Sequence, residues 1–256
     1  MPDDHASAPL LEISGRIARL RLNRPREHNR IDPTDLAVLV DHFARIEQDP
    51  DIRVLVLTGT GDMTFSSGYT LSQVAQLSAE AVAFDQVVDR LEVLRVPTLA
   101  AINGGVYGGA TDLALACDFR IGVTGSRFRM PASRIGLHYY PGGMRRYVER
   151  LGLSVAKQLF LLGEVVAPEQ LLQWGYLTEL VVPAELAGRV QALAEQLAAV
   201  APAAAQGMKR HLNAIAAGRF DAAAAHADYV RSLRSKDLQE GLAAFVEKRA
   251  PRFSGD

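Results

Sequence analysis

The segment from Ala101 to Asp118 contains the residues best suited to hold a negative charge. It reads A-I-N-G-G-V-Y-G-G-A-T-D-L-A-L-A-C-D, so an apolar strand is followed by four glycines and then by an apolar helical pattern from Ala110 to Ala116. Glycines let the backbone approach a ligand closely, and a helix that begins after them points unpaired N–H groups at that ligand. Such a turn can stabilise charge that develops on oxygen, as at an oxyanion or an enolate. The same pattern also occurs where a turn binds phosphate or only packs tightly, so by itself it leaves the chemistry open.

A second segment, from Arg53 to Leu71, narrows the chemistry. It reads R-V-L-V-L-T-G-T-G-D-M-T-F-S-S-G-Y-T-L, with a strand pattern over Val54 to Thr58 and then a turn. Together with L-N-R-P-R-E-H-N at residues 22–29, it resembles the crotonase superfamily, the enoyl-CoA hydratase/isomerase family. The resemblance runs nearly end to end, since further pieces follow in the family's order: P-G-G-x-x-R-Y near Pro141, W-G-Y-L-T-E-L-V-V-P at Trp174 to Pro183, and E-G-L-A-A-F-V-E-K-R at Glu240 to Arg249.

The resemblance implies an α/β fold, a crotonase-like spiral of ββα turns with a helical C-terminal region. The family's shared device is an oxyanion hole of two backbone N–H groups, which polarises the thioester carbonyl of an acyl-CoA and stabilises its enolate. By position these donors are the N–H of Tyr69, after the glycine of S-S-G-Y, and the N–H of Gly109 in G-G-A-T-D. The Tyr69 side chain leaves that N–H intact and is expected to border the acyl pocket. The alternative is that both are ordinary turn residues.

The resemblance also implies which residues contact the acyl-CoA. Arg26 follows N-R-P and is suited to a charge-assisted contact with phosphate. Thr70 stands where the family more often has Asp, and Lys248 lies, next to Arg249, where basic residues reach CoA, sometimes from a neighbouring subunit. For each of these, a solvated surface position is the alternative. The full predicted set of substrate-binding residues is Arg26, Gly68, Thr70, Leu71, Gly108, Ala132, Tyr139 and Lys248.

The acid–base positions depart from the hydratase pattern. A hydratase needs two carboxylates around one water, one to deprotonate the water and the other to protonate the α-carbon. The first position is Asp112, shorter than the family's usual Glu, and the alternative is a carboxylate that only favours the first turn of a helix. The second position falls in R-M-P-A-S, where Ala132 replaces the family's Glu. Because alanine cannot transfer a proton, the sequence argues against two-carboxylate hydration and against isomerases that depend on that Glu.

The next loop offers other groups. G-L-H-Y-Y-P-G-G, from Gly136 to Gly143, aligns with a pocket loop where several family members place a specialised catalytic residue. Tyr140 falls where some of them carry an Asp nucleophile or acid, and His138, which titrates near neutrality, is close to it. We therefore predict Asp112, His138 and Tyr140 as catalytic residues. The alternative is that these aromatic side chains only shape an acyl pocket.

Composition excludes several classes of protein. With 256 residues the chain can bury a sizeable core, and a net charge of −1 gives no attraction to nucleic acid or acidic membranes. Cys117 is the only cysteine, which excludes an internal disulfide and a cysteine-based metal cluster and fits a reducing compartment. The polar, acidic N-terminus is not a signal peptide, and the longest near-apolar run, Val96 to Ala116, is broken by polar residues and glycines. We expect a cytoplasmic protein with no metal, no nucleic acid partner and no membrane span.

Strand and helix patterns alternate in the first half of the chain, which argues for an α/β class. The alternation alone favours a doubly wound sheet, but we adopt the spiral that the resemblance implies. After Pro183 the sequence is helical and Ala-rich. We predict a spiral core that binds acyl-CoA over residues 1–195 and a helical oligomerisation region over 196–256, assembling as a homotrimer or a dimer of trimers.

Three functions remain open. The first is an enoyl-CoA hydratase/isomerase-type lyase or isomerase that works through a thioester enolate, with no cofactor other than the CoA of its substrate. The second is a non-catalytic acyl-CoA binding protein, which Ala132 favours. The third is a C–C bond hydrolase of the same superfamily, which would use His138 to handle a water.

Overall fold

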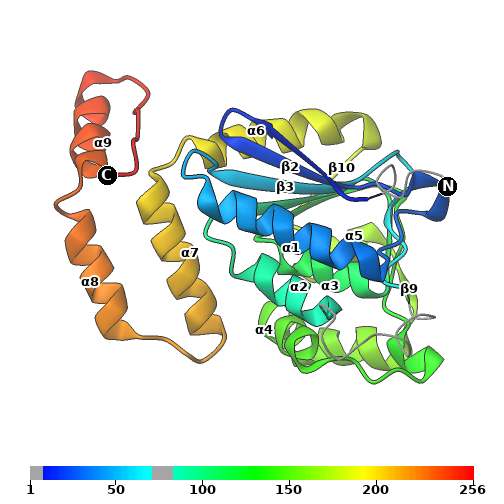
Figure 1. The fold of residues 1–256 in the computed structure, drawn as a ribbon. Helices are drawn as coiled ribbons and strands as arrows, with labels where there is room; N and C mark the ends of the chain where they lie inside the picture. Colours follow the sequence, from blue (N-terminus) through cyan, green and yellow to red (C-terminus); the bar gives the residue numbers. More distant parts are fainter. Residues whose placement is uncertain (1–7, 71–82) are drawn as a thin grey trace.

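The computed structural model describes residues 8–70 and 83–256, and a six-stranded sheet runs through its middle (Figure 1). In spatial order its strands are β1 (Leu10–Ser14), β2 (Ile17–Leu22), β3 (Val54–Gly59), β5 (Thr98–Ile102), β7 (Phe119–Val123) and β10 (Glu179–Val181). β1 pairs with β2 in antiparallel fashion, and all the other neighbours are parallel. Parallel neighbours require crossover connections, which helices provide here.

A second sheet of four short strands lies beside the first. Its order is β4 (Thr64–Ser66), β6 (Gly105–Tyr107), β8 (Phe128–Arg129) and β9 (Val165–Val166). The successive units β3–β4, β5–β6 and β7–β8 each give one strand to each sheet and then lead into a helix. This confirms the predicted spiral of ββα turns. The doubly wound alternative is wrong because the chain leaves the large sheet after each long strand and forms a short strand of the second sheet. These short strands have two or three residues, too few to show an alternation of apolar and polar residues in the sequence.

Helices cover both faces of the large sheet. α1 (Pro33–Gln48), α2 (Phe84–Glu92), α3 (Gly109–Ala116) and α4 (Pro141–Lys157) share one core with alternate strand residues such as Leu55 and Leu57. The intervening residues, such as Val56, face α6 (Leu186–Ala198) in a second core. A short helix, α5 (Pro168–Gln173), precedes β10. Because side chains along a strand alternate between the two faces of the sheet, alternate residues pack into the first and the second core.

The C-terminal helices extend away from the sheets in Figure 1. They are α7 (Pro202–Ala216), α8 (Ala222–Ser232) and α9 (Lys236–Glu247). Lys209 ties α7 to the core by an ion pair with Asp118 and a hydrogen bond to the carbonyl oxygen of Val96. Residue 195 lies within α6, which packs on the sheet, so the helices that project begin after α6. The oligomerisation role of residues 196–256 stays a prediction.

Among residues 8–70 and 83–256, none of the helices combines the length and the hydropathy that a membrane-spanning helix requires.

Candidate active site

Two glycine turns meet at the start of α3. Gly108 precedes the helix with φ +53°, and Gly68 has φ +97°, both in the region that favours glycine. A Cβ atom on Gly68 would lie 2.7 Å from the carbonyl oxygen of Tyr107 and 3.2 Å from the nitrogen of Gly109. The structure therefore brings the segments of the two predicted oxyanion donors together, and only glycine fits at their junction.

Backbone pairing fixes the direction of the Tyr69 N–H. Ile31 donates its N–H to the carbonyl oxygen of Gly68 (2.9 Å), and Thr70 donates to the carbonyl oxygen of Ile31 (3.0 Å). Backbone groups of successive extended residues point to opposite edges, so the Tyr69 N–H points away from Ile31. Gly109 is the first residue of α3, and the first N–H groups of a helix have no acceptor within it. Both predicted donors can therefore bind a ligand oxygen without breaking the pairing that holds them.

The loop that carries Arg26 lies along the segment that leads to Gly68 and Tyr69. Asn29 holds it there: its side-chain amide donates to the carbonyl oxygen of Thr64 (2.7 Å), and its own carbonyl accepts from the hydroxyl of Ser66 (2.7 Å). Arg26 is exposed on a 3₁₀ turn, Pro25–Glu27. Arg26 thus lies on a loop that borders Gly68. Its contact with CoA phosphate stays a prediction.

Thr70 has a local partner that accounts for its side chain. Its hydroxyl donates to Asp32 Oδ1 (2.5 Å), and Asp32 caps the start of α1. Hydrogen bonds from Arg30 and Thr70 hold the pKa of Asp32 below its ordinary value. Thr70 therefore has a hydrogen-bond partner within the protein, and its predicted contact with the substrate stays a prediction. Leu71 lies outside the described residues.

Asp112 is a fully buried carboxylate in the first turn of α3. Its Oδ2 accepts from the hydroxyl of Tyr140 (2.5 Å) and from Nη1 of Arg146 (2.6 Å). Its Oδ1 is buried and has no hydrogen-bond partner within the described residues. Burial raises the pKa of Asp112 above its ordinary value, and the positive charge of Arg146 opposes that rise. A buried carboxylate with one free oxygen is suited to accept and return a proton.

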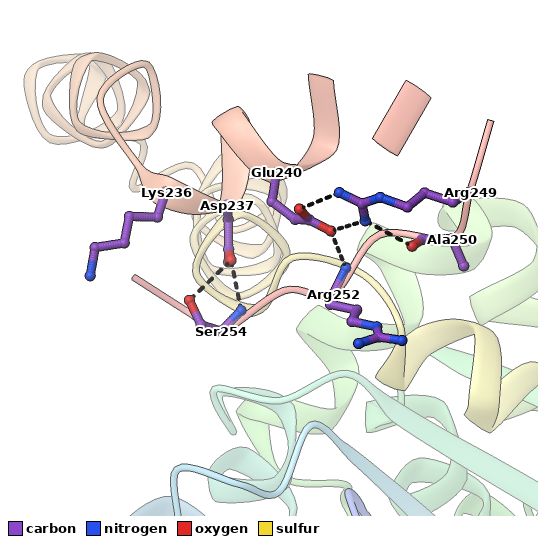
Figure 2. Close-up of a pocket in the computed structure, with 7 residues that line it drawn as sticks. All are labelled: Lys236, Asp237, Glu240, Arg249, Ala250, Arg252 and Ser254. Atoms are coloured by element: carbon purple, nitrogen blue, oxygen red, sulfur yellow. Dashed lines mark hydrogen bonds and ion pairs between the residues drawn. The ribbon is translucent and has the colours of Figure 1, made fainter. Parts of the chain in front are cut away.

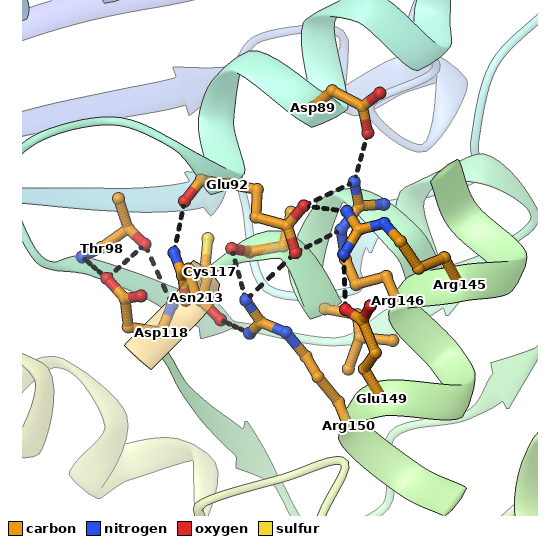
Figure 3. Close-up of polar contacts among 12 residues, drawn as sticks. Asp89, Glu92, Thr98, Cys117, Asp118, Arg145, Arg146, Glu149, Arg150 and Asn213 are labelled. Atoms are coloured by element: carbon orange, nitrogen blue, oxygen red, sulfur yellow. Dashed lines mark hydrogen bonds and ion pairs between the residues drawn. The ribbon is translucent and has the colours of Figure 1, made fainter. Parts of the chain in front are cut away.

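Arg146 belongs to a network of charges between α2 and α4 (Figure 3). Its side chain is 0% exposed and contacts Asp89 (2.5 Å) and Glu92 (3.1 Å) as well as Asp112. Glu92 is shared with Arg145, which lies next to Arg146 on α4. Sequence reasoning missed Arg146, although its signal was present as the arginine of P-G-G-x-x-R-Y.

Aromatic side chains connect the two halves of the site. Tyr69 stacks on Phe84, with ring centroids 5.1 Å apart, and Phe84 meets the edge of Tyr140 at 6.3 Å. Tyr140 stacks on Tyr139, with centroids 4.3 Å apart. A Cβ atom on Gly109 would lie 2.8 Å from the Phe84 ring, so this aromatic row passes directly over the start of α3. Phe84 was also missed, because one aromatic residue at the start of a helix gives no signal.

The remaining predicted acid–base positions do not contact Asp112 in the described part of the chain. His138 is exposed, and its Nδ1 lies 2.9 Å from the carbonyl oxygen of Tyr139. Ala132 is buried at the start of a 3₁₀ turn, Ala132–Ile135. The structure thus brings together two of the three predicted catalytic residues, Asp112 and Tyr140, and the role of His138 stays a prediction.

Lys248 lies far from this site within one chain. It is exposed at the end of α9, which Figure 1 places beyond α7 and away from α3. The neighbouring Arg249 is bound by Glu240, across a hollow that the C-terminal tail forms with α9 (Figure 2). The predicted contact between Lys248 and CoA therefore needs a second copy of the chain.

Comparisons with known proteins agree over nearly the whole chain. Residues 12–256 match the family model described as enoyl-CoA hydratase/isomerase. The chain is 33% identical over 256 residues to (E)-benzylidenesuccinyl-CoA hydratase of Thauera aromatica, with 96% of this chain and 98% of that protein aligned. It is 31% identical over 255 residues to carnitinyl-CoA dehydratase of Salmonella arizonae, with 96% and 97% aligned. It superposes on an enoyl-CoA hydratase/carnithine racemase from Magnetospirillum magneticum with a TM-score of 0.91 and 26% identity, covering 97% of this chain and 96% of that one. The chain belongs to the enoyl-CoA hydratase/isomerase family.

Proposed function

We propose that this protein is a lyase that adds water to, or removes it from, the acyl group of a CoA thioester. The main support for the proposal is the buried carboxylate of Asp112, in the first turn of the helix that begins at Gly109. Its Oδ1 has no partner in the part of the chain that the structure describes. The thioester oxygen would accept from the N–H groups of Tyr69 and Gly109, which places the acyl carbons beside α3. A hydratase and a dehydratase among the relatives support a reaction of this class.

The proposed chemistry needs one proton relay rather than two. Asp112 Oδ1 takes a proton from water while the water oxygen bonds to Cβ of the enoyl group. The electron pair of the double bond moves to the thioester oxygen, where the two N–H groups stabilise the enolate. The proton on Oδ1 then passes to Cα, so the water hydrogen ends on Cα and the hydroxyl on Cβ. Elimination follows the same steps in reverse.

Tyr140 assists as a hydrogen-bond donor. Burial raises the pKa of its hydroxyl far above the ordinary value, with the charge of Asp112 adding to the rise, so the phenol stays neutral. A neutral phenol cannot act as a base here, but its hydrogen bond occupies Oδ2 and leaves Oδ1 for the substrate. No cofactor besides the CoA of the substrate is required by these steps.

The acyl group is proposed to be aromatic. Three aromatic rings lie beside the oxyanion donors, those of Tyr69, Phe84 and Tyr140. Aromatic rings favour offset or edge-to-face contacts with another ring. The name of the benzylidenesuccinyl-CoA hydratase also describes a phenyl-bearing thioester. Crotonyl-CoA, which has only a methyl group in that place, is expected to be hydrated very slowly.

A panel of CoA thioesters tests the proposal. Crotonyl-, octenoyl- and cinnamoyl-CoA and their 3-hydroxy forms would be incubated with the protein, and products identified by mass spectrometry. We expect gain or loss of one water with the cinnamoyl pair. Cleavage of a C–C bond would instead favour the hydrolase, in which His138 handles a water.

A second candidate is a non-catalytic acyl-CoA binding protein, and Ala132 favours it because the second proton-transfer position has no ionisable group. Calorimetry separates the two: binding of every thioester without any turnover would establish the binding protein.

For either function we propose assembly as a homotrimer or a dimer of trimers, which would bring Lys248 to a neighbouring site. The buried, unpaired Cys117 is in keeping with a cytoplasmic location.

A further inference from the structure

Arg146 is the most completely buried cation near the candidate site. Its guanidinium contacts carboxylates from two helices: Asp89 Oδ1 (2.5 Å) and Glu92 Oε1 (3.1 Å) on α2, and Asp112 Oδ2 (2.6 Å) on α3. A guanidinium presents its donors in a fixed planar fork, so contacts on α2 determine where the remaining N–H groups point. The anchored fork therefore fixes the position of the Asp112 carboxylate.

The contacts at Asp112 are asymmetric. Both Arg146 and Tyr140 bind Oδ2, while Oδ1 has no partner among the described residues. The backbone of α4 closes the Oδ2 side, because a Cβ atom on Gly143 would lie 2.9 Å from Oδ2. Oδ2 is thus fully occupied by the protein, and proton transfer is left to Oδ1.

We propose that Arg146 is a positioning residue that selects Oδ1 of Asp112 as the reactive oxygen and keeps this buried carboxyl group ionised. The inference rests on the proposed function, in which Asp112 takes a proton from water. A carboxyl group in a fully buried site without a cation would be neutral at neutral pH and could not serve as a base.

The other charged and titratable groups around Asp112 do not supply this effect. Glu92 on α2 is negative and raises the pKa of Asp112, as burial does. The surrounding tyrosines are held neutral by burial, which raises the pKa of each; they are Tyr139, Tyr140, Tyr147 and Tyr176. Asp89 and Arg145 lie farther along the network: Asp89 pairs with Arg146 and Arg145 pairs with Glu92, and within the described ranges neither contacts Asp112. Arg146 is the cation in direct contact with Asp112 in the described part of the chain.

Arg145 provides a matched control. It precedes Arg146 on α4 and shares Glu92 with it, but its other ion pair is with Glu149. Its side chain is 33% exposed, against 0% for Arg146. A substitution at either position therefore removes a guanidinium group from α4 and an ion pair from Glu92. Only the substitution of Arg146 also removes a contact with Asp112.

The test compares Arg146→Gln with Arg145→Gln, and Arg146→Lys with Arg145→Lys. The protonation midpoint of Asp112 would be measured by carbon-13 NMR of aspartate-labelled protein, with the resonance assigned by Asp112→Asn. The acid limb of the kcat/KM profile against pH would be measured in parallel. We expect Arg146→Gln to raise both midpoints by about 1–3 pH units, because an opposite charge in contact lowers the pKa of a carboxyl group by about that much. Arg145→Gln should leave both where the unaltered protein has them.

The lysine pair covers the case in which Arg146→Gln does not fold. Arg146→Lys keeps the charge but loses the fork, so the midpoint should move less while kcat falls at least about 10-fold with KM kept. Arg145→Lys should change neither constant. An unshifted Asp112 midpoint in folded Arg146→Gln, or an unchanged kcat in Arg146→Lys, overturns the proposal. If no thioester is turned over, the proposed function fails, while the NMR midpoints still decide whether Arg146 controls the ionisation of Asp112.

Discussion

Tyr140 donates a hydrogen bond of 2.5 Å to Oδ2 of Asp112, although the two residues lie 28 positions apart in the sequence. Tyr140 directly precedes α4, and Asp112 is in the first turn of α3, so the contact joins two helix N-termini. Because Arg146 binds the same oxygen, Oδ1 is left without a hydrogen-bond partner among residues 8–70 and 83–256. The proposed proton transfer through Oδ1 depends on this arrangement.

Replacing Tyr140 by phenylalanine removes one of the two donors to Oδ2. A hydrogen bond to a charged group contributes about 1.5–3 kcal/mol, so we expect kcat to fall about 10- to 100-fold while thioester affinity is kept. The reason is that Asp112 can then rotate and share both oxygens with Arg146. Steady-state kinetics and calorimetry on the same preparation measure both quantities.

His138→Gln is the companion variant, because His138 is on the same loop and its ring bonds to a backbone carbonyl rather than to Asp112. We expect it to lower kcat less than Tyr140→Phe does. A larger loss than that of Tyr140→Phe would return His138 to the proton relay and contradict the single-carboxylate scheme.

Gly68→Ala should disrupt the oxyanion donors. The new methyl group would meet the carbonyl oxygen of Tyr107 at 2.7 Å and the Gly109 nitrogen at 3.2 Å, which forces the two segments apart. Loss of one oxyanion donor typically lowers kcat by about 10²–10³-fold. Gly125→Ala is the matched control, since Gly125 also has a positive φ of +76°, but a Cβ atom there would have no neighbour within 4 Å. Equal turnover in the two variants would show that Gly68 does not shape the site.

Much of this arrangement could be predicted from the sequence, and the reasons for the limits are physical. The strand–glycine–helix pattern at Gly108 identified the start of α3, and a run of apolar residues predicted a buried helix around Asp112. The pairing of Asp112 with Tyr140 could not be predicted, because it depends on the directions of side chains from two helices. Arg146 carried a motif signal but no periodic one, because its neighbours one turn along α4, Glu149 and Arg150, are charged and the sequence there is typical of an exposed helix face.

The C-terminal helices are predicted to assemble the oligomer. In α9, Phe245 is 84% exposed and Val246 is 79% exposed, an unusual extent for large apolar side chains on a helix. Phe245→Glu should therefore convert the predicted trimer or hexamer to smaller species in sedimentation velocity. Gln239→Glu adds the same charge to an exposed position of the same helix and should leave the assembly intact. A monomer in the unaltered protein at micromolar concentration would contradict the prediction.

Cys117 is predicted to be unreactive in the folded protein. It is fully buried, and burial raises the pKa of its thiol to about 12, so only roughly one molecule in 10⁴ carries the thiolate at pH 8. Iodoacetamide should leave the native protein unmodified in mass spectrometry and add one group per chain in urea. Rapid modification under native conditions would mean that the end of α3 opens readily.

Asp112→Asn is the decisive variant, because it removes the proposed base and keeps the size of the side chain. Turnover and thioester affinity would both be measured with cinnamoyl-CoA, or with whichever thioester the panel identifies. The unaltered protein would be compared with Asp112→Asn and with the control Asp41→Asn, on the exposed face of α1. We expect Asp112→Asn to lose about 10²–10⁴-fold in kcat with affinity kept, and Asp41→Asn to change neither kcat nor affinity. Turnover in Asp112→Asn equal to that of the unaltered protein would rule out Asp112 as the base.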